Sequence, residues 1–263
     1  MNGNLVGGFN IPNRKVANGV WGVNEVAGYT KQGMWPTAND PSFSSVAFLL
    51  HGDAVLATGN PLDITGNSDV QWYSTSAGRS GKLVASPFFP NQLSFNIGSG
   101  LGTLIAAKNS GQYSLGTQDF TIDFLAYPST VVNSVNAFDM HSAGGAAVIP
   151  LMGWDSGKFY YFVNGAYKIQ AFVYSTNTPY LITYNRTAST GTLFVNGSSV
   201  GTWADTSNYI SSPTITCGGS GSGSANASGS TMDEFRLTIG VARNPSTYFN
   251  TASQPLLQRF PDR

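Results

Sequence analysis

Two segments of the chain share a pattern that is typical of β-hairpins. In YYFVNGAYKIQAF (160–172) and TLFVNGSSVGTW (192–203), an Asn-Gly pair separates two arms that are rich in aromatic and β-branched residues. Asn-Gly suits the type I′ turn, in which both central residues have positive φ. The sequence therefore predicts two hairpins, with turns centred on Asn164-Gly165 and Asn196-Gly197.

The composition favours strands and tight turns over helices. Glycine occurs 31 times and aromatic residues make up 13% of the chain, whereas the Ala, Glu, Lys and Leu that build long helices are scarce. The segment DFTIDFLAYP (119–128) is the clearest strand, because Phe120, Ile122 and Phe124 alternate with other residues. We expect an all-β fold, in which one face of this strand lies in the core and the other is wet or packs on a neighbour.

A glycine- and serine-rich stretch, CGGSGSGSANASGSTMDEF (217–235), resembles an interdomain linker in composition. Only about thirty residues follow it, which is too few for a domain, and they begin with another strand. It is therefore predicted to be a loop within one sandwich. The expected organisation is an N-terminal arm and helix over 1–39, a β-sandwich over 40–250 and a C-terminal tail over 251–263.

The segment GVWGVNEVAGYTKQGMWP (19–36) is predicted to form a short helix that begins near Asn24 and ends near Gly33. A helix of about two to three turns is marginal in water without a packing partner. Its apolar residues should therefore dock on the chain's own sandwich or on another protein. These anchoring residues are Trp21, Val23, Val26, Met34 and Trp35.

The charge pattern excludes several partners. Only 10% of the residues are charged and the net charge is zero, so neither nucleic acid nor an anionic membrane surface is an expected partner. The start of the chain lacks the apolar region of a signal peptide, and no stretch approaches the roughly 18 apolar residues of a membrane span. A single cysteine, Cys217, excludes an internal disulfide and is expected to be buried.

Catalytic patterns are weak. The two glutamates, Glu25 and Glu234, lie in no paired-acid motif, although glycosidases need two positioned acids. Asp119 and Asp123 lie four positions apart on a strand, which separates them by roughly 13 Å and is too far for the usual glycosidase geometry. Both histidines are expected to have structural roles. The sequence therefore predicts a protein that is not an enzyme and that requires no cofactor.

Several segments follow one another in the order and spacing of a known domain. They are GQYSLGTQDFTIDFLAYP, PYLITYNRTASTGTLFVNGSSVGT, the glycine-rich loop and MDEFRLTIGVARN. Through these segments the chain resembles the concanavalin A-like, laminin-G-like jelly-roll domain over residues 45–250. The resemblance implies a jelly-roll β-sandwich. The chain departs from that family at two places. It has Pro179-Tyr180 where the family has a Trp-His pair, and Asn196 where the family has an aspartate. The family's ligand chemistry is therefore not carried over.

The lead of the domain is similar to a narrower group. DPSFSSVAFLLHGD (40–53), preceded by a short helix that ends in MWP, resembles the lead of laminin-G-like proteins of tailed bacteriophages, particularly those of marine and cyanobacterial hosts. Such proteins are virion components. The resemblance implies a capsid decoration, fibre or tail-associated protein, made in the host cytoplasm, homo-oligomeric, and anchored to capsid or tail subunits through its N-terminal segment. The alternative is a glycan-binding adhesion module that recognises host surface polysaccharide.

Three aromatic residues near predicted turns are candidates for a glycan platform: Trp154, Trp203 and Tyr209. Sugar-binding sites combine a flat aromatic face with amide and hydroxyl groups. Aromatic residues are also common in cores and at protein interfaces, so both of these alternatives stay open.

The resemblance also implies a calcium ion, since many relatives of this fold hold one with oxygen donors from loops. Asp53 and Asp233 are the carboxylates expected to bind it, together with loop carbonyls. The alternative is structural. Asp53 would then be a solvated turn residue, and Asp233 would cap a strand or pair with Arg236 or Arg243.

Overall fold

The computed structural model of the protein describes residues 42–56, 58–73, 81–97, 103–131, 135–141, 148–219 and 230–245. The chain divides into two units, residues 1–44 with 258–263 and residues 45–257, and the described strands all belong to the second. The predicted helix and the anchoring residues Trp21, Val23, Val26, Met34 and Trp35 lie outside the described residues. The helix, its anchoring role and the domain boundaries at 40 and 250 therefore stay predictions.

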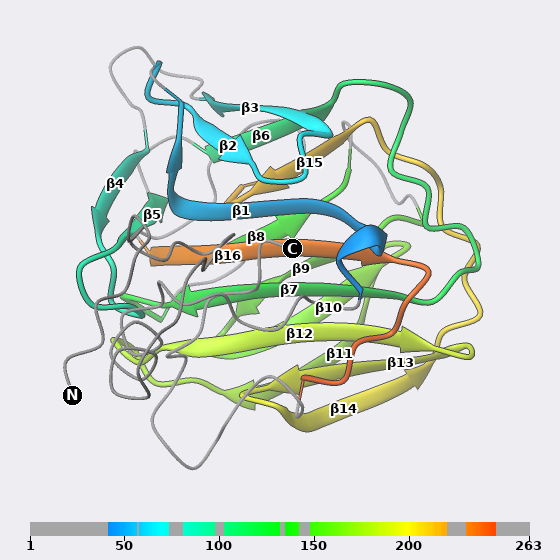
Figure 1. The fold of residues 1–263 in the computed structure, drawn as a ribbon. Helices are drawn as coiled ribbons and strands as arrows, with labels where there is room; N and C mark the ends of the chain where they lie inside the picture. Colours follow the sequence, from blue (N-terminus) through cyan, green and yellow to red (C-terminus); the bar gives the residue numbers. More distant parts are fainter. Residues whose placement is uncertain are drawn as a thin grey trace, which may run out of the picture. The chain divides into compact units, whose positions relative to one another are not determined.

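The described strands form two antiparallel sheets that face each other (Figure 1). Within the described residues the larger sheet has nine strands in the order β14-β13-β12-β7-β16-β1-β2, and β5 and β4 extend from β16. Its strands are β1 (Val46–Val55), β2 (Pro61–Asp63), β4 (Lys82–Ala85), β5 (Leu93–Ile97), β7 (Phe120–Tyr127), β12 (Tyr180–Thr187), β13 (Thr190–Val195), β14 (Ser198–Ala204) and β16 (Ser230–Ile239).

The smaller sheet has seven described strands in the order β11-β10-β9-β8-β15-β6-β3. They are β3 (Ser68–Tyr73), β6 (Thr103–Lys108), β8 (Val135–Asp139), β9 (Leu151–Asp155), β10 (Lys158–Val163), β11 (Ala166–Val173) and β15 (Thr214–Cys217). A 3₁₀ turn, η1 (Phe43–Ser45), precedes β1. The predicted all-β sandwich is confirmed. Among the residues that the structure describes, no helix is long or apolar enough to cross a membrane.

Both predicted hairpins are present. Asn164 (φ 51°) and Gly165 (φ 72°) join β10 to β11, and Asn196 (φ 51°) and Gly197 (φ 77°) join β13 to β14. Positive φ at both central residues is the requirement of the type I′ turn. The local pattern alone therefore located these two turns.

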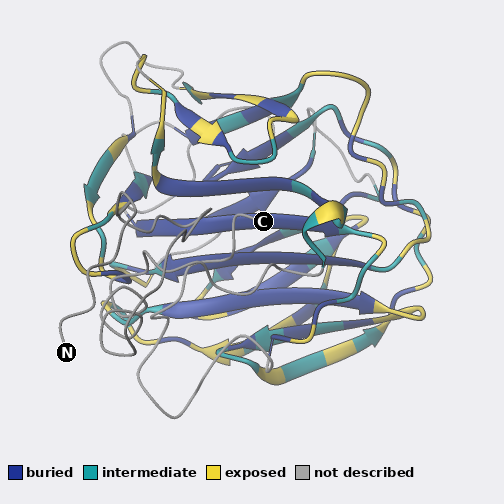
Figure 2. Ribbon diagram, viewed as in Figure 1, coloured by how far each residue is buried: buried dark blue, intermediate teal, exposed yellow. Residues whose placement is uncertain are grey.

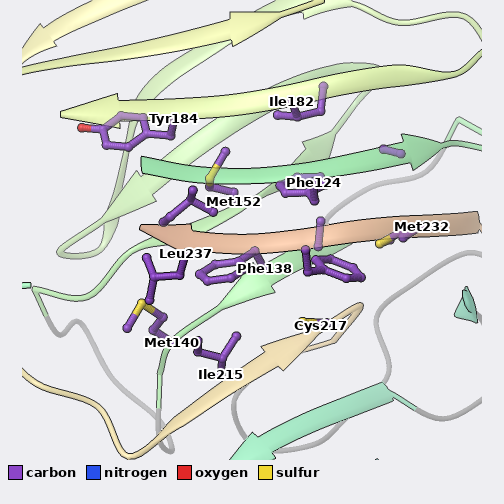
Figure 3. Packing of buried hydrophobic residues seen from close by; sticks show 14 of the residues in the cluster. Phe124, Phe138, Met140, Met152, Ile182, Tyr184, Ile215, Cys217, Met232 and Leu237 are labelled. Carbon is purple, nitrogen blue, oxygen red and sulfur yellow. The ribbon is translucent and has the colours of Figure 1, made fainter. Parts of the chain in front are cut away.

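The core lies between the sheets. Phe124 of β7, Met232 of β16, Phe138 of β8 and Met152 of β9 all belong to this core (Figure 3), and all four are fully buried. The central strands are buried along most of their length (Figure 2). Cys217 also lies in this core, as predicted, and burial raises the pKa of its thiol well above the usual value.

The second face of β7 was expected to be wet or to pack on a neighbour, and the structure excludes the first alternative, because Thr121 and Asp123 on this face are fully buried. The segment that follows β16 lies against them. The Arg243 backbone N–H donates to the Thr121 hydroxyl at 2.8 Å, and the Arg243 guanidinium pairs with Asp123 at 3.0 Å. Thr183 of β12 also donates to Asp123 at 2.6 Å. Hydrogen bonds and an ion pair therefore satisfy this polar face, which is covered by the segment after β16.

Candidate functional site

The outer face of the seven-stranded sheet carries a group of aromatic side chains. In β10, Phe159 and Tyr161 are buried in the core, so the alternation of the strand turns Tyr160 and Phe162 to the opposite face. Tyr167 of β11 lies directly across from Phe162 in the register. We call Tyr160, Phe162 and Tyr167 the aromatic patch.

Tyr160 forms the floor of the aromatic patch. It lies opposite Gly153 of β9, and its hydroxyl lies 2.9 Å from two acceptors, the Val135 carbonyl oxygen and Asn136 Oδ1, which share its one proton. A Cβ added at Gly153 would overlap the Val135 carbonyl oxygen and lie 2.9 Å from the Tyr160 hydroxyl. Burial raises the pKa of Tyr160 well above its ordinary value, so the phenol stays neutral and can donate. Only glycine at 153 leaves room for this arrangement.

Tyr167 is the exposed member of the patch, with 43% of its surface accessible. Its ring meets Tyr160 edge-on at 5.1 Å between centroids and Phe162 at 5.4 Å. Its hydroxyl donates to Asp155 Oδ2 at 3.0 Å, and Gln170 Nε2 reaches the same oxygen at 3.5 Å. Partial burial, the hydrogen bond to Asp155 and the charge of that residue raise the pKa of Tyr167. An exposed ring thus stands beside a carboxylate and an amide.

A second polar group adjoins the patch through Asn136. The amide nitrogen of Asn136 lies 3.4 Å from Asp139 Oδ2, while Asp139 Oδ1 accepts from the backbone N–H and from Nδ1 of His141 at 2.8 and 2.6 Å. His141 is thereby held against Asp139, and its structural role stays a prediction. The chain of contacts from His141 to Tyr160 supports the floor of the patch from β8.

This arrangement can bind a ligand that has both apolar and hydroxyl surfaces. An aromatic ring offers a large apolar face, a carboxylate accepts hydrogen bonds and an amide both donates and accepts. The sequence did not reveal the site, because Phe159, Tyr160, Tyr161 and Phe162 are all aromatic and give no contrast between inner and outer faces. The pairing register of β10 with β11 is what brings Tyr167 next to Phe162, and the sequence does not reveal that register.

The structure corrects the predicted glycan platform. Trp154 is fully buried and packs edge-on against Phe159 and Tyr174, with centroids 6.1 and 6.3 Å away. Tyr209 is 3% exposed. Neither ring can offer a face to a sugar, because both belong to the core between the sheets.

Trp203 and Tyr209 are nevertheless brought together by one network. Trp203 Nε1 donates to the Tyr184 hydroxyl at 2.8 Å, and the hydroxyls of Tyr184 and Tyr209 both donate to Asp205 Oδ2 at 2.7 Å. Lys168 Nζ lies 5.5 Å from the centre of the Trp203 ring. The half-buried Trp203 is therefore engaged through both its N–H and its ring, and the network closes the edge of the sandwich between β11 and β14.

The two aspartates predicted to bind calcium differ in environment. Asp53 is exposed, whereas Asp233 is fully buried. Asp233 Oδ1 accepts from the backbone N–H of Gly52 at 2.8 Å and Oδ2 from the Ser94 hydroxyl at 2.6 Å. Among the described residues, no group of three or more histidine, cysteine or acidic side chains is arranged to hold a metal ion. Asp233 ties β16 to β1 and β5, and calcium binding stays a prediction.

No protein-family model matches the sequence, and no curated protein matches it. Solved structures with a similar fold include the receptor binding domain of botulinum neurotoxin C/D mosaic serotype, with a TM-score of 0.59 and 15% identity over 78% of this chain and 50% of that one. The binding domain of Paraclostridial Mosquitocidal Protein 1 gives 0.58 and 15% over 80% and 52%.

A third similar structure is the binding domain of botulinum neurotoxin DC in complex with SialylT, with a TM-score of 0.56 and 16% identity over 78% of this chain and 50% of that one. The chain thus spans about half the length of the structures that it matches. At these identities the likeness shows a shared β-sandwich fold.

Proposed function

We propose that the chain is a carbohydrate-binding adhesion module that acts without catalysis. The observation that carries this proposal is the aromatic patch, in which the exposed Tyr167 ring stands beside Asp155 and Gln170 on the outer face of the sheet. A sugar ring presents C–H groups on one face and hydroxyl groups at its edge. The patch matches both, because its ring can pack on the C–H face while the carboxylate and the amide bind the hydroxyls.

The similar fold of toxin binding domains supports the proposal. One of these domains is in complex with SialylT and another with rat synaptotagmin II, and this chain matches about half of the length of each. We extend a ligand-binding role to this chain on the strength of its own aromatic patch.

The absence of catalysis is the second part of the proposal. Glycoside hydrolysis requires two positioned carboxyl groups, usually with a glutamate as acid. Glu234, the one glutamate among the described residues, is 1% exposed and hydrogen-bonded to His51. It is therefore not presented to a substrate at the surface.

The place of display is the third part. The likeness of residues 40–53 and of the preceding segment to phage laminin-G-like proteins favours a virion surface protein, anchored through residues 19–36. Quantitative mass spectrometry of purified particles tests this. A ratio near that of the capsid protein indicates a head decoration, and a few copies indicate a tail or vertex fibre. Absence of the chain from the particles would contradict display on the virion. The protein would then be an adhesion module that is not part of the virion.

Binding to an array of immobilised glycans tests the main proposal. Wild type should bind, and Tyr167→Ala should weaken binding by at least about tenfold, as expected for a tyrosine that carries an interface. Tyr73→Ala is the matched control, because Tyr73 is 40% exposed on β3, the opposite edge strand of the same sheet. Equal binding by the two variants, or no binding by wild type, would contradict the proposal.

A further inference from the structure

The two Asn-Gly turns form a matched pair within one chain. Asn164 and Asn196 both have a φ of 51°, and each is followed by a glycine of positive φ. In each hairpin, two residue pairs lie between the turn and the nearest register shift. The backbone conformation and the local pairing are therefore alike, so a difference in reactivity between the two asparagines has to come from their surroundings.

Those surroundings differ. The Asn196 backbone N–H donates to the Leu181 carbonyl oxygen at 2.9 Å, and the Leu181 N–H donates to Asn196 Oδ1 at 2.8 Å. Strand β12 thus holds both the backbone and the side chain of Asn196. Asn164 and Gly165 are exposed, and the Asn164 side chain has no hydrogen-bond partner among the residues that the structure describes. The side-chain amide of Asn164 can therefore rotate in water.

An Asn-Gly pair can rearrange without a catalyst. The backbone nitrogen of the glycine attacks the asparagine Cγ, a C–N bond forms, and the side-chain nitrogen leaves as ammonia with the proton of the glycine N–H. Water then opens the cyclic imide at either of its carbonyl groups and leaves aspartate or isoaspartate. The net change consumes water and releases ammonia, with no oxidation or reduction. Glycine favours ring closure, because it has no Cβ to crowd the attacking nitrogen.

Ring closure requires the asparagine side chain to turn toward the next backbone nitrogen, and the turn has to relax as it does so. At Asn196 this movement breaks both hydrogen bonds to Leu181, which is 1% exposed, and leaves buried backbone groups without a partner. At Asn164 no corresponding bond is lost, and the exposed end of a hairpin opens locally more easily than the middle of a sheet.

We propose that Asn164 is a site of spontaneous deamidation, and that the contacts with Leu181 protect Asn196 from the same reaction. Deamidation at Asn164 does not depend on glycan binding, but it changes the hairpin that carries Tyr167. Aspartate suits a type I′ turn as asparagine does. Isoaspartate adds an atom to the backbone of the turn, and the turn sets the register that pairs Phe162 with Tyr167.

The test incubates the purified full chain at neutral pH, below its unfolding temperature, in water labelled with heavy oxygen. Digestion in ordinary water and peptide mapping by mass spectrometry follow, so the label marks residues hydrolysed during the incubation. Asn164 should react at least about tenfold faster than Asn196, because the latter must first lose two hydrogen bonds. Two more Asn-Gly pairs, at 2–3 and 18–19, lie outside the described residues and give separate peptides.

The same chain unfolded in urea is the control. It lacks the contacts with Leu181, and FVNG is common to both segments, so Asn164 and Asn196 should then react at similar rates. Asn164→Gln should remove most of the label from its peptide and leave the rate at Asn196 unchanged, because the longer side chain closes the ring less readily. Equal rates at the two sites in the folded chain would overturn the inference. An Asn164 that stays unmodified in the folded chain while the unfolded chain reacts would also overturn it.

Discussion

His51 of β1 and Glu234 of β16 form a buried pair, with 2.7 Å between His51 Nδ1 and Glu234 Oε1 although 183 residues separate them in sequence. Both side chains are 1% exposed. Glu234 has a φ of 53° where the register of β16 with β7 shifts between Asp233 and Arg236. A non-glycine residue in this region of φ costs free energy, so the surrounding contacts must hold it there.

Replacing Glu234 by glutamine should destabilise the protein by about 1–3 kcal/mol, because it weakens the buried hydrogen bond between Glu234 and His51. Urea unfolding measures the change. The double variant His51→Gln with Glu234→Gln is the control and should recover part of the loss. A single variant within about 0.5 kcal/mol of wild type would show that the pair contributes little.

Gly153→Ala should destabilise the sheet and weaken glycan binding together, since the added methyl overlaps the Val135 carbonyl and crowds the Tyr160 hydroxyl. The expected loss is about 1–3 kcal/mol, as for other overpacked sites. Gly66→Ala is the comparison, because Gly66 has a φ of 72° and open space around its Cβ position. It should cost about 1 kcal/mol through backbone strain alone and leave binding unchanged. Thermal unfolding and array binding of both variants decide this.

The stability of the protein should fall steeply above pH 10. Burial, followed by the charges of neighbouring groups, raises the pKa values of Tyr161 and Tyr184 far above the ordinary 10.0. The folded state therefore holds these protons more tightly than the unfolded state does, and the stability present below pH 10.0 is lost as the pH rises. Tyrosinate absorbance of the buried rings should appear only together with loss of the β-sheet circular dichroism signal. Full ionisation in a folded chain would contradict the prediction.

The buried carboxyl group of Asp63 should make the stability of the protein depend on pH in the acidic range. Burial raises its pKa above 3.8, even though backbone and side-chain donors from Leu49 and Thr65 oppose the shift. The folded state therefore binds this proton more tightly, and its contribution to stability falls as the pH rises from 3.8 through the raised value. The difference in unfolding free energy between wild type and Asp63→Asn should change in that window and be flat above it. A difference that is independent of pH would refute the assignment.

Trp154 should behave as a core residue. Trp154→Ala should cost about 3–5 kcal/mol, the usual loss for a large aromatic side chain. Trp154→Phe should cost less, because it keeps part of the ring packing and removes a buried Nε1 that has no hydrogen-bond partner among the described residues. Glycan binding by the folded Trp154→Phe variant should equal that of wild type. Selective loss of binding with unchanged stability would restore Trp154 as a ligand contact.

The sequence by itself determined the features that adjacent residues encode. The Asn-Gly turns at 164–165 and 196–197 depend on the φ preferences of two neighbouring residues, and the strand at 119–128 depends on a period of two. These features depend on adjacent residues, so the surrounding fold does not have to be known to predict them. The all-β class follows from their repetition along the chain.

The tertiary structure alone decided which side chains reach the surface. The register of β10 with β11 shifts between Tyr161 and Phe162, so that Ile169 faces Tyr161 while Tyr167 faces Phe162 and Lys168 is passed over. This shift turns Tyr167 outward, although a regular strand would place it on the same face as the buried Ile169. Such a shift arises from pairing with another strand, so no local pattern in β11 could predict it, and the ring on which the proposed function depends became visible only when the two strands were paired.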